Sequence, residues 1–339
     1  MIMKCVAIKG VKEFEVKEIP ELEPEKGKVL INVKKTGICG SDIHYWDLGS
    51  PEGLVMGHEY SGVVVDNGGR EDLNIGDRVT ALPISPCGKC EACLTGNIHY
   101  CSETWNHASG LSLDNSGGLA PQLKVRSDMV LKLPDNMSDE EGALVEPTAV
   151  GYHAVNLANV KVGDHVLVVG GGIIGLVSAM FAKKSGASKV IVSEANESRG
   201  EMAVKLGVAD AWVDAKNQDE MNKYAGTFDR VIECCGNAPA VNSALTLVKA
   251  GGTVVLVGVS MNLINYMSIA HVMRELNVIG AIAYTKEEFA KCISMIANKE
   301  IDVMKFVSKT VTLEEVQSSY EELTSGNSSC IKILVDPNK

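Results

Sequence analysis

The chain has 339 residues, of which 45% are hydrophobic and 22% charged, so it can bury a large core, and a disordered or fibrous protein is excluded. The formal net charge of −11 argues against a nucleic-acid-binding face or a basic membrane-surface helix, because both need clustered lysine and arginine. The length is typical of about two domains.

The first part of the chain, up to about residue 148, contains short β-branched segments separated by glycine and proline. This pattern is typical of a barrel-like or sandwich-like β unit. The N-terminal residues alternate like a strand and do not form a secretion signal, so we expect a cytoplasmic protein. The other predicted strands are FEVKEI, KVLINVKKTG, YSGVVVDNG, DRVTALP and LKVRS.

After residue 148, apolar strands alternate with helices, which predicts an α/β fold with a doubly wound parallel sheet covered on both faces. The most apolar stretch, 166–182, is interrupted by glycines, which favours a strand, a turn and a helix over a membrane span. The predicted strands are 165–169, 189–194, FDRVIECCG, TVVLVGV and LNVIGAI, and the predicted helices are 173–185, 197–207 and PAVNSALTLVKAGG. Past residue 284, KEEFAKCISMIANKEI predicts an amphipathic helix, and CIKILVD a strand outside the alternating series.

A G-x-G-x-x-G motif joins the first of these strands to its helix. Gly170 permits the tight turn, Gly172 lets a pyrophosphate approach the backbone, and Gly175 lets the strand and helix pack closely. Ile173 and Ile174 begin the helix, whose N-terminal N–H groups favour phosphate. The motif therefore predicts a dinucleotide site, and the alternative is a glycine turn that binds nothing.

The residue that ends the second strand bears on which dinucleotide is bound. Glu194 can accept hydrogen bonds from both adenosine ribose hydroxyls and would repel a 2′-phosphate, so it favours NAD over NADP. Arg199 lies close by in the sequence and works against this selectivity.

Four of the ten cysteines lie close together in the sequence, and a protein of the reducing cytoplasm does not use them as disulfides. Four thiolates on so short a loop can wrap one tetrahedral Zn²⁺ with no position open to water. Loose cysteines are the alternative, but exposed thiols oxidise, and the flanking residues are not basic enough for a DNA-reading finger. The predicted structural zinc ligands are Cys87, Cys90, Cys93 and Cys101.

Three further segments carry residues suited to metal binding: GICGSDIHYW around Cys39, GHEYSG around His58 and VEPTAV around Glu146. Spacing alone cannot show that they meet in space. Together with the four-cysteine loop and the glycine motif, they follow the order found in the zinc-containing medium-chain dehydrogenase/reductase superfamily, which the sequence resembles over essentially its whole length. CGSDIHYW and VEP are most similar to the polyol (sorbitol/xylitol) dehydrogenase branch and its butanediol and threonine dehydrogenase relatives.

The resemblance implies two domains. A GroES-like catalytic domain would comprise residues 1–147, with 285–339 returning to it, and a NAD-binding Rossmann domain would comprise residues 148–284.

The resemblance also implies a second, catalytic zinc. Cys39 and His58 would bind it, Glu59 would be a third ligand or a close neighbour, and Glu146 would either bind the metal or hold its water. A mixed shell with an exchangeable position is what catalytic zinc needs, because the ion then favours the ionised form of a bound alcohol. The carbon of that alcohol would deliver a hydride to the nicotinamide.

The alcohol proton would leave through Ser41 and, as in relatives, through the cofactor ribose and His44. His44 suits this step because an imidazole titrates near neutral pH. Local hydrogen bonds in a turn are the alternative role for both residues.

We therefore expect an oxidoreductase that moves a hydride between NAD and a secondary alcohol, which could be a polyol, a diol or a sugar derivative. A ketone or hydroxyketone reductase and a non-catalytic NAD-binding relative are the alternatives. Ala283 stands where the polyol branch often has an arginine, and the loop between His44 and Gly57 is short, which widens the choice of substrate. Tyr45 and Trp46 suit a substrate pocket or a packed core equally. By analogy we expect a homo-oligomer, dimer or tetramer, with no nucleic-acid or membrane partner.

Overall fold

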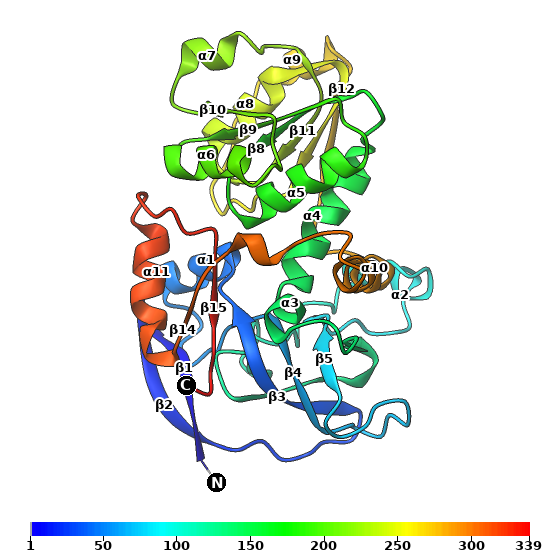
Figure 1. Ribbon diagram of the computed structural model, residues 1–339, viewed down its shortest axis with the longest axis vertical. Helices are drawn as coiled ribbons and strands as arrows, with labels where there is room; N and C mark the ends of the chain where they lie inside the picture. Colours follow the sequence, from blue (N-terminus) through cyan, green and yellow to red (C-terminus); the bar gives the residue numbers. More distant parts are fainter. Residues whose placement is uncertain (1) are drawn as a thin grey trace. The chain divides into compact units, whose positions relative to one another are not determined.

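The computed structural model describes residues 2–339, which form two compact units (Figure 1). The first unit comprises the chain up to Glu146 together with Tyr284–Lys339, and the second comprises Pro147–Ala283. Among the described residues, no helix has the length and apolar character needed to cross a membrane.

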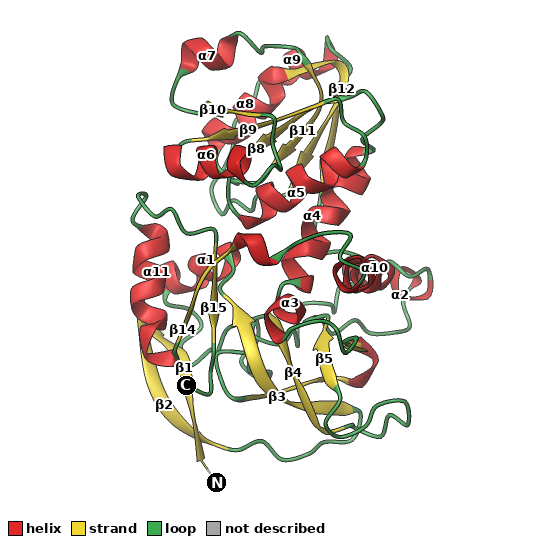
Figure 2. Cartoon of the chain, in the orientation of Figure 1, coloured by secondary structure: helices red, strands yellow, loops and turns green. Residues whose placement is uncertain are grey.

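The first unit is built on a seven-stranded, mostly antiparallel sheet in the order β14-β15-β3-β4-β5-β7, with β6 paired to β3 (Figure 2). A separate antiparallel pair joins β1 (Ile2–Gly10) to β2 (Glu13–Pro20). The strands of the larger sheet are β3 (Lys28–Gly37), β4 (Glu59–Asp66), β5 (Arg78–Ala81), β6 (Gln122–Arg126), β7 (Val130–Lys132), β14 (Val307–Val311) and β15 (Lys332–Val335).

The strand predicted near the C-terminus is β15, and it lies inside this sheet. It pairs antiparallel with β3 and parallel with β14, and all four of its residues are buried. A strand near the end of the chain therefore completes the sheet that β3 begins.

Helices are more numerous in this unit than its β-branched sequence predicts. Only α10 was expected, from its apolar periodicity, and a capping box between Thr285 and Glu288 starts it. The helices are α1 (Gly40–Leu48), α2 (Glu91–Leu94), α3 (Asp139–Ala143), α10 (Lys286–Ala297) and α11 (Val316–Thr324), and the 3-10 turns are Ile98–Tyr100, Ser127–Met129, Met304–Phe306 and Leu313–Glu315.

Trp46, on α1, is a core residue. It is buried, and its ring lies 6.4 Å from that of Phe14 and 5.7 Å from that of Tyr320. Tyr45 is partly buried and packs against the same cluster.

The second unit contains a six-stranded parallel sheet in the order β10-β9-β8-β11-β12-β13. The strand order reverses at the β8–β11 pair, and because crossovers are right-handed, the helices before and after this point cover opposite faces. The parallel α/β sheet predicted from the sequence is thus confirmed. The strands are β8 (His165–Val169), β9 (Lys189–Glu194), β10 (Ala211–Asp214), β11 (Phe228–Glu233), β12 (Val248–Leu256) and β13 (Asn277–Gly280).

The helices of this unit are α5 (Ile173–Lys184), α6 (Glu197–Lys205), α7 (Gln218–Asn222), α8 (Ala238–Leu247) and α9 (Ser268–Val272), and α4 (Val145–Ala158) begins in the first unit and continues into the second. The predicted helix PAVNSALTLVKAGG was too long. It ends at Leu247, because Val248 is fully buried and pairs with Phe228 of β11, which makes it the first residue of β12.

Candidate metal and dinucleotide sites

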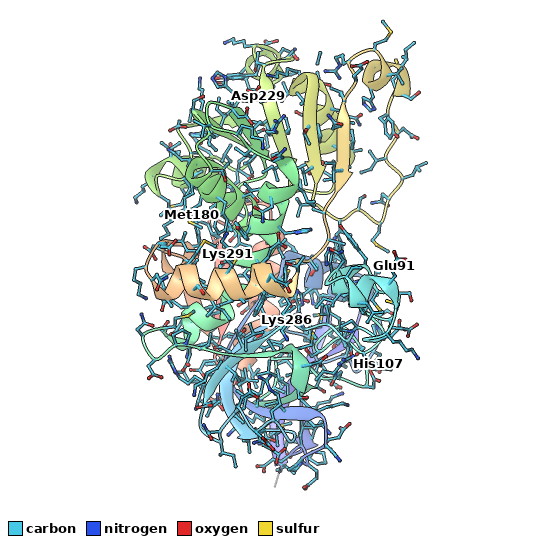
Figure 3. All side chains as sticks on the ribbon, turned by 90° about the vertical axis from the view of Figure 1, so that its right-hand side faces the viewer. Glu91, His107, Met180, Asp229, Lys286 and Lys291 are labelled. Atoms are coloured by element: carbon cyan, nitrogen blue, oxygen red, sulfur yellow. The ribbon has the colours of Figure 1, made fainter. Side chains whose placement is uncertain are left out.

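The four clustered cysteines converge around one point. Their sulfur atoms all lie within 4.8 Å of one another, with 3.5 Å between Cys90 and Cys93 and 3.9 Å between Cys87 and Cys93. Cys90 is the N-cap of the short helix α2, which begins at Glu91 (labelled in Figure 3), and Cys93 lies within this helix. All four cysteines are reduced.

Backbone N–H groups donate hydrogen bonds to these sulfur atoms, which favours the thiolate form that binds a cation. Cys101 accepts hydrogen bonds from the N–H groups of Cys87 and Glu103 at 3.3 and 3.4 Å, and the first of these lowers the pKa of the Cys101 thiol to about 6. Cys93 accepts one from Gly88 at 3.3 Å, but burial raises its pKa to about 12. Four sulfurs so arranged fit a tetrahedral Zn²⁺, which would ionise them all.

A second group lies where β3 and β4 meet the start of α1. The ligand atoms of Cys39, His58 and Glu59 also lie within 4.8 Å of one another. Cys39 is the N-cap of α1, and His58 and Glu59 stand at the start of β4. One thiolate, one imidazole and one carboxylate leave a position open at a zinc ion, unlike the four cysteines.

Asp42 connects two members of this group. One of its oxygens accepts a hydrogen bond from the Cys39 backbone N–H at 3.2 Å, and the other lies 3.1 Å from His58 Nδ1. Burial lowers the pKa of His58, but the Asp42 carboxylate and the Cys39 sulfur together raise it well above its usual value. Asp42 thus orients the ring so that Nε2 is the nitrogen available to a metal.

Glu59 supports the fit of a cation here. Its side chain is fully buried, and its Oε1 has no hydrogen-bond partner among residues 2–339. Its Oε2 is ion-paired with the Lys332 ammonium. A buried carboxylate oxygen without a donor is costly, and a bound cation would satisfy it.

Glu146 is near this group but is held separately, by Tyr284, whose hydroxyl donates to Glu146 Oε1 at 2.9 Å. Burial raises the pKa of Glu146 to about 7, against the influence of His58 and of this hydrogen bond. Ser41 donates to the Cys39 sulfur at 3.2 Å, and His44 is half-buried about one turn further along α1.

The glycine loop of the second unit has the geometry that its motif predicts. Gly170 has a φ of +107°, and a Cβ at Gly175 would overlap the Gly170 carbonyl oxygen. Gly172, the N-cap of α5, has nothing within 4 Å of the place where its Cβ would stand, so a ligand can approach the backbone there. Ile173 and Ile174 form the first turn of α5.

Glu194, at the end of β9, lies against this loop. Its Oε2 accepts the Gly171 N–H at 2.6 Å, and its Oε1 accepts those of Ala195 and Asn196, both at 2.8 Å. Arg199 lies in the first turn of α6, and its buried Nε has no hydrogen-bond partner among the residues that the structure describes.

Sequence reasoning missed Asp42, Tyr284 and Lys332. Asp42 follows Cys39 at the spacing of a capping box, which could have indicated it. Lys332 interrupts an apolar run, and a charge in a predicted core strand is a signal in itself. Tyr284 carries no such signal.

Known proteins share this architecture. Residues 25–135 match the profile of the alcohol dehydrogenase GroES-like domain, and residues 174–298 match that of the zinc-binding dehydrogenases. A protein of Aspergillus clavatus named "Probable D-xylulose reductase A" is 33% identical over 338 residues, covering 95% of this chain and 93% of that protein.

Two crystal structures are also similar to this chain. Bacillus subtilis 2R,3R-butanediol dehydrogenase has a TM-score of 0.87 at 30% identity, covering 99% of this chain and 100% of that one. Escherichia coli L-idonate 5-dehydrogenase has a TM-score of 0.88 at 25% identity, covering 99% of each chain. The expected combination of a GroES-like domain with a Rossmann sheet is confirmed. The chain therefore belongs to the zinc-containing medium-chain dehydrogenase/reductase superfamily, near its polyol dehydrogenases, and is an oxidoreductase.

Proposed function

We propose that this protein is a zinc-dependent dehydrogenase that transfers a hydride between NAD and a secondary alcohol, with its catalytic metal in the first unit and its dinucleotide in the second. The observation that carries the proposal is the presence of two different groups of metal ligands. The four cysteines form a closed site, whereas Cys39, His58 and Glu59 form an open one.

The metal ligands follow from this grouping. Cys39, His58 and Glu59 bind the catalytic zinc, and Cys87, Cys90, Cys93 and Cys101 bind a structural one. Glu146 acts from outside the ligand group, because the Tyr284 hydroxyl holds its carboxylate. Its proposed role is to hold a water or a substrate hydroxyl rather than to bind the ion.

Two residues of α1, Ser41 and His44, transfer the proton of the substrate alcohol in this proposal. When bound, zinc supplies Lewis acidity that favours the ionised form of the substrate alcohol, and NAD accepts its hydride. Ser41, whose hydroxyl contacts the Cys39 sulfur, would accept the alcohol proton as it passes its own hydroxyl proton on toward His44. His44, half-buried on the same helix, would take up that proton on its imidazole and release one to solvent.

The dinucleotide site is formed by the glycine loop and the end of β9. Gly170, Gly172 and Gly175 give the pyrophosphate access to the N-terminus of α5. Glu194 selects NAD, because its Oε2, which accepts only the Gly171 N–H, can accept a further bond from a ribose hydroxyl, and its charge would repel a 2′-phosphate. Arg199 contributes an unpaired guanidinium nitrogen at the same edge.

The substrate class is a polyol, a diol or a sugar-derived alcohol. The relative named for D-xylulose reduction and the solved butanediol and idonate dehydrogenases support this class. The D-xylulose name also favours ketone reduction as the second candidate, because one site serves both directions. Ala283 brings no charge to the substrate, which favours small diols over long polyols.

The protein is also proposed to be a cytoplasmic homodimer. Its ten cysteines are reduced, as zinc thiolates require. The segment 259–282 exposes many apolar side chains, among them Leu263 at 85% and Met273 at 77%, and α9 buries none of its residues. β13 (Asn277–Gly280) lies within this segment and is an edge strand of the sheet, so a second copy can pair with it and cover the apolar side chains.

Metal analysis and NADH absorbance test the function. We expect two zinc ions per chain and NADH formation with some members of a polyol and diol panel. The variant C39S should lose one zinc and its activity while it keeps the other zinc. One zinc and no turnover in the natural chain would favour a non-catalytic relative, and full activity in C39S would refute the catalytic assignment.

A further inference from the structure

The last strand of the chain carries a lysine into the group formed by Cys39, His58 and Glu59. Lys332 begins β15, and its side chain is 0% exposed, although lysine is among the residues least often buried. Its Nζ donates to the Ile38 carbonyl oxygen at 2.8 Å and pairs with Glu59 Oε2. A full positive charge therefore lies, away from water, beside a proposed zinc ligand.

Residues of three neighbouring strands, β3, β4 and β15, surround this ion pair. Gly37 of β3 pairs with Glu59 of β4 on one side and with Leu334 of β15 on the other. A Cβ at Gly37 would overlap Glu59 Oε2, so only glycine leaves room for the carboxylate in this position. Because a buried ion pair often adds little to stability, stability alone does not account for this arrangement.

The charges of the group indicate what Lys332 contributes. Asp42 and Glu59 are fully buried, and Cys39 is half-buried. Glu146 is a third buried carboxylate near the group. A zinc dication facing one thiolate and these three carboxylates would leave two negative charges uncompensated, which is costly in a buried site. The Lys332 ammonium supplies one positive charge against them.

We propose that Lys332 is a positioning residue of the catalytic metal site, which fixes the Glu59 carboxylate between its own ammonium and the metal and limits the negative charge that Glu59 gives to the ion. This inference rests on the metal-binding role proposed above for Cys39, His58 and Glu59. Sharing Glu59 with an ammonium leaves more positive charge on the ion, and a Lewis acid needs that charge.

The variant K332M tests the proposal, because it removes the charge and keeps an unbranched apolar stem. The Glu59 carboxylate is then free to bind the ion with its full negative charge. We expect this site to hold zinc more tightly in a chelator competition, on the order of tenfold, because a carboxylate that is no longer shared with an ammonium attracts the ion more strongly. The visible spectrum of the cobalt-substituted protein should change, and kcat should fall with little change in KM. Unchanged or weaker zinc binding with an unchanged cobalt spectrum would overturn the proposal.

A matched control is K35M. Lys35 lies in the same sheet and pairs with Asp336 at 2.9 Å and Glu140 at 3.6 Å, so its loss removes a half-buried ion pair that does not involve Glu59. Its zinc affinity should equal that of the natural chain. A tenfold change in K35M would mean that loss of any ion pair in this sheet affects the metal, and would overturn the specific role of Lys332.

The pair of variants E59Q and E59Q/K332M keeps the test decisive where K332M alone fails to fold, since the double variant buries no lone charge. Because Lys332 acts through Glu59, adding K332M to E59Q should change zinc affinity by less than about twofold. A larger change would contradict the proposal. The zinc content of the natural chain distinguishes failure of the proposed function from failure of the role proposed for Lys332. If the natural chain holds only one zinc, the proposed function is refuted. If it holds two zincs and K332M binds zinc with unchanged affinity, only the role of Lys332 is refuted.

Discussion

At the scale of single residues, the first unit gathers groups that would be costly to bury alone. Asp42 lies beside His58, Glu59 pairs with Lys332, and Glu146 accepts a hydrogen bond from Tyr284. Such sets of partnered, buried ionisable groups are typical of sites that perform chemistry. Their partners also determine how each group responds to pH and to metal.

Glu146 should make the metal-free protein less stable as the pH rises. Burial raises its pKa to about 7, against 4.5 for the free side chain, so the folded protein binds this proton more tightly than the unfolded chain does. That stabilisation is complete below about pH 4.5 and is lost as the pH rises through 7. Glutamine does not titrate, so the variant E146Q should not lose this stabilisation. The free energy of unfolding of E146Q minus that of the natural chain should therefore increase by about 2 kcal/mol between pH 5 and pH 8.

Urea unfolding of both metal-free proteins at the two pH values measures this difference. With zinc bound, the cation favours the carboxylate, so the gain at pH 8 should shrink. A stability difference between the two proteins that is the same at pH 5 and pH 8 would show that Glu146 is already ionised at both.

Sequence patterns identified some members of this site and could not identify others. Cys39, His58 and Glu59 stand in short motifs that are typical of the superfamily. Lys332 lies 294 positions away from Ile38, whose carbonyl oxygen it contacts, and no local pattern carries information over that distance. Tyr284 meets Glu146 only because the chain returns to the first unit after the Rossmann sheet.

At the scale of elements, the parallel strands were the easiest to predict. The bounds of β8 and β9 agree with the prediction, because each has a run of apolar residues at its centre, followed by glycine after β8 and by Glu194 at the end of β9. Helix α1 was missed, since its nine residues show little apolar periodicity, and the boundary between α8 and β12 was misplaced, since it depends on the partner strand β11.

The strand–turn–helix element predicts opposite results for two of its glycines. The variant G172A should fold with nearly unchanged stability, because Gly172 has an ordinary φ of −76° and free space around it. Its methyl group would occupy the space needed by a pyrophosphate, so NADH affinity should fall at least about tenfold, or 1.4 kcal/mol. G175A should instead lose about 1–3 kcal/mol of stability, because its Cβ overlaps Gly170.

Thermal unfolding and NADH fluorescence titration measure the two effects separately. G172A provides the matched control for G175A, since both add one methyl group to the same loop. Unimpaired NADH binding by a fully folded G172A would show that the dinucleotide does not approach the backbone at this turn.

At the scale of the whole molecule, the α/β class followed from the alternation of strands and helices, the four-cysteine metal site was predicted from its spacing, and the second metal site was predicted only from the family resemblance. What the sequence could not show is which apolar side chains stay exposed once the chain has folded. Leu263 and Met273 are as apolar as core residues, yet the second unit leaves them on its surface beside the edge strand β13. Burial depends on the complete packing of the sheet, and a local pattern does not contain it.

This surface should determine the oligomeric state. The variant L263D puts a charge on the most exposed of the large apolar side chains of the segment 259–282, and burying that charge in a dimer interface would cost several kcal/mol. We expect the mass from light scattering to fall from that of the homodimer to that of a monomer, with the zinc content unchanged.

V162D is the control, because Val162 is 88% exposed in the same unit but lies outside the segment 259–282. If L263D keeps the mass of the natural chain, or V162D loses it too, the 259–282 segment is not the interface. A shift in L263D alone would mean that the apolar segment and the β13 edge lie within the dimer interface, where the partner subunit covers them.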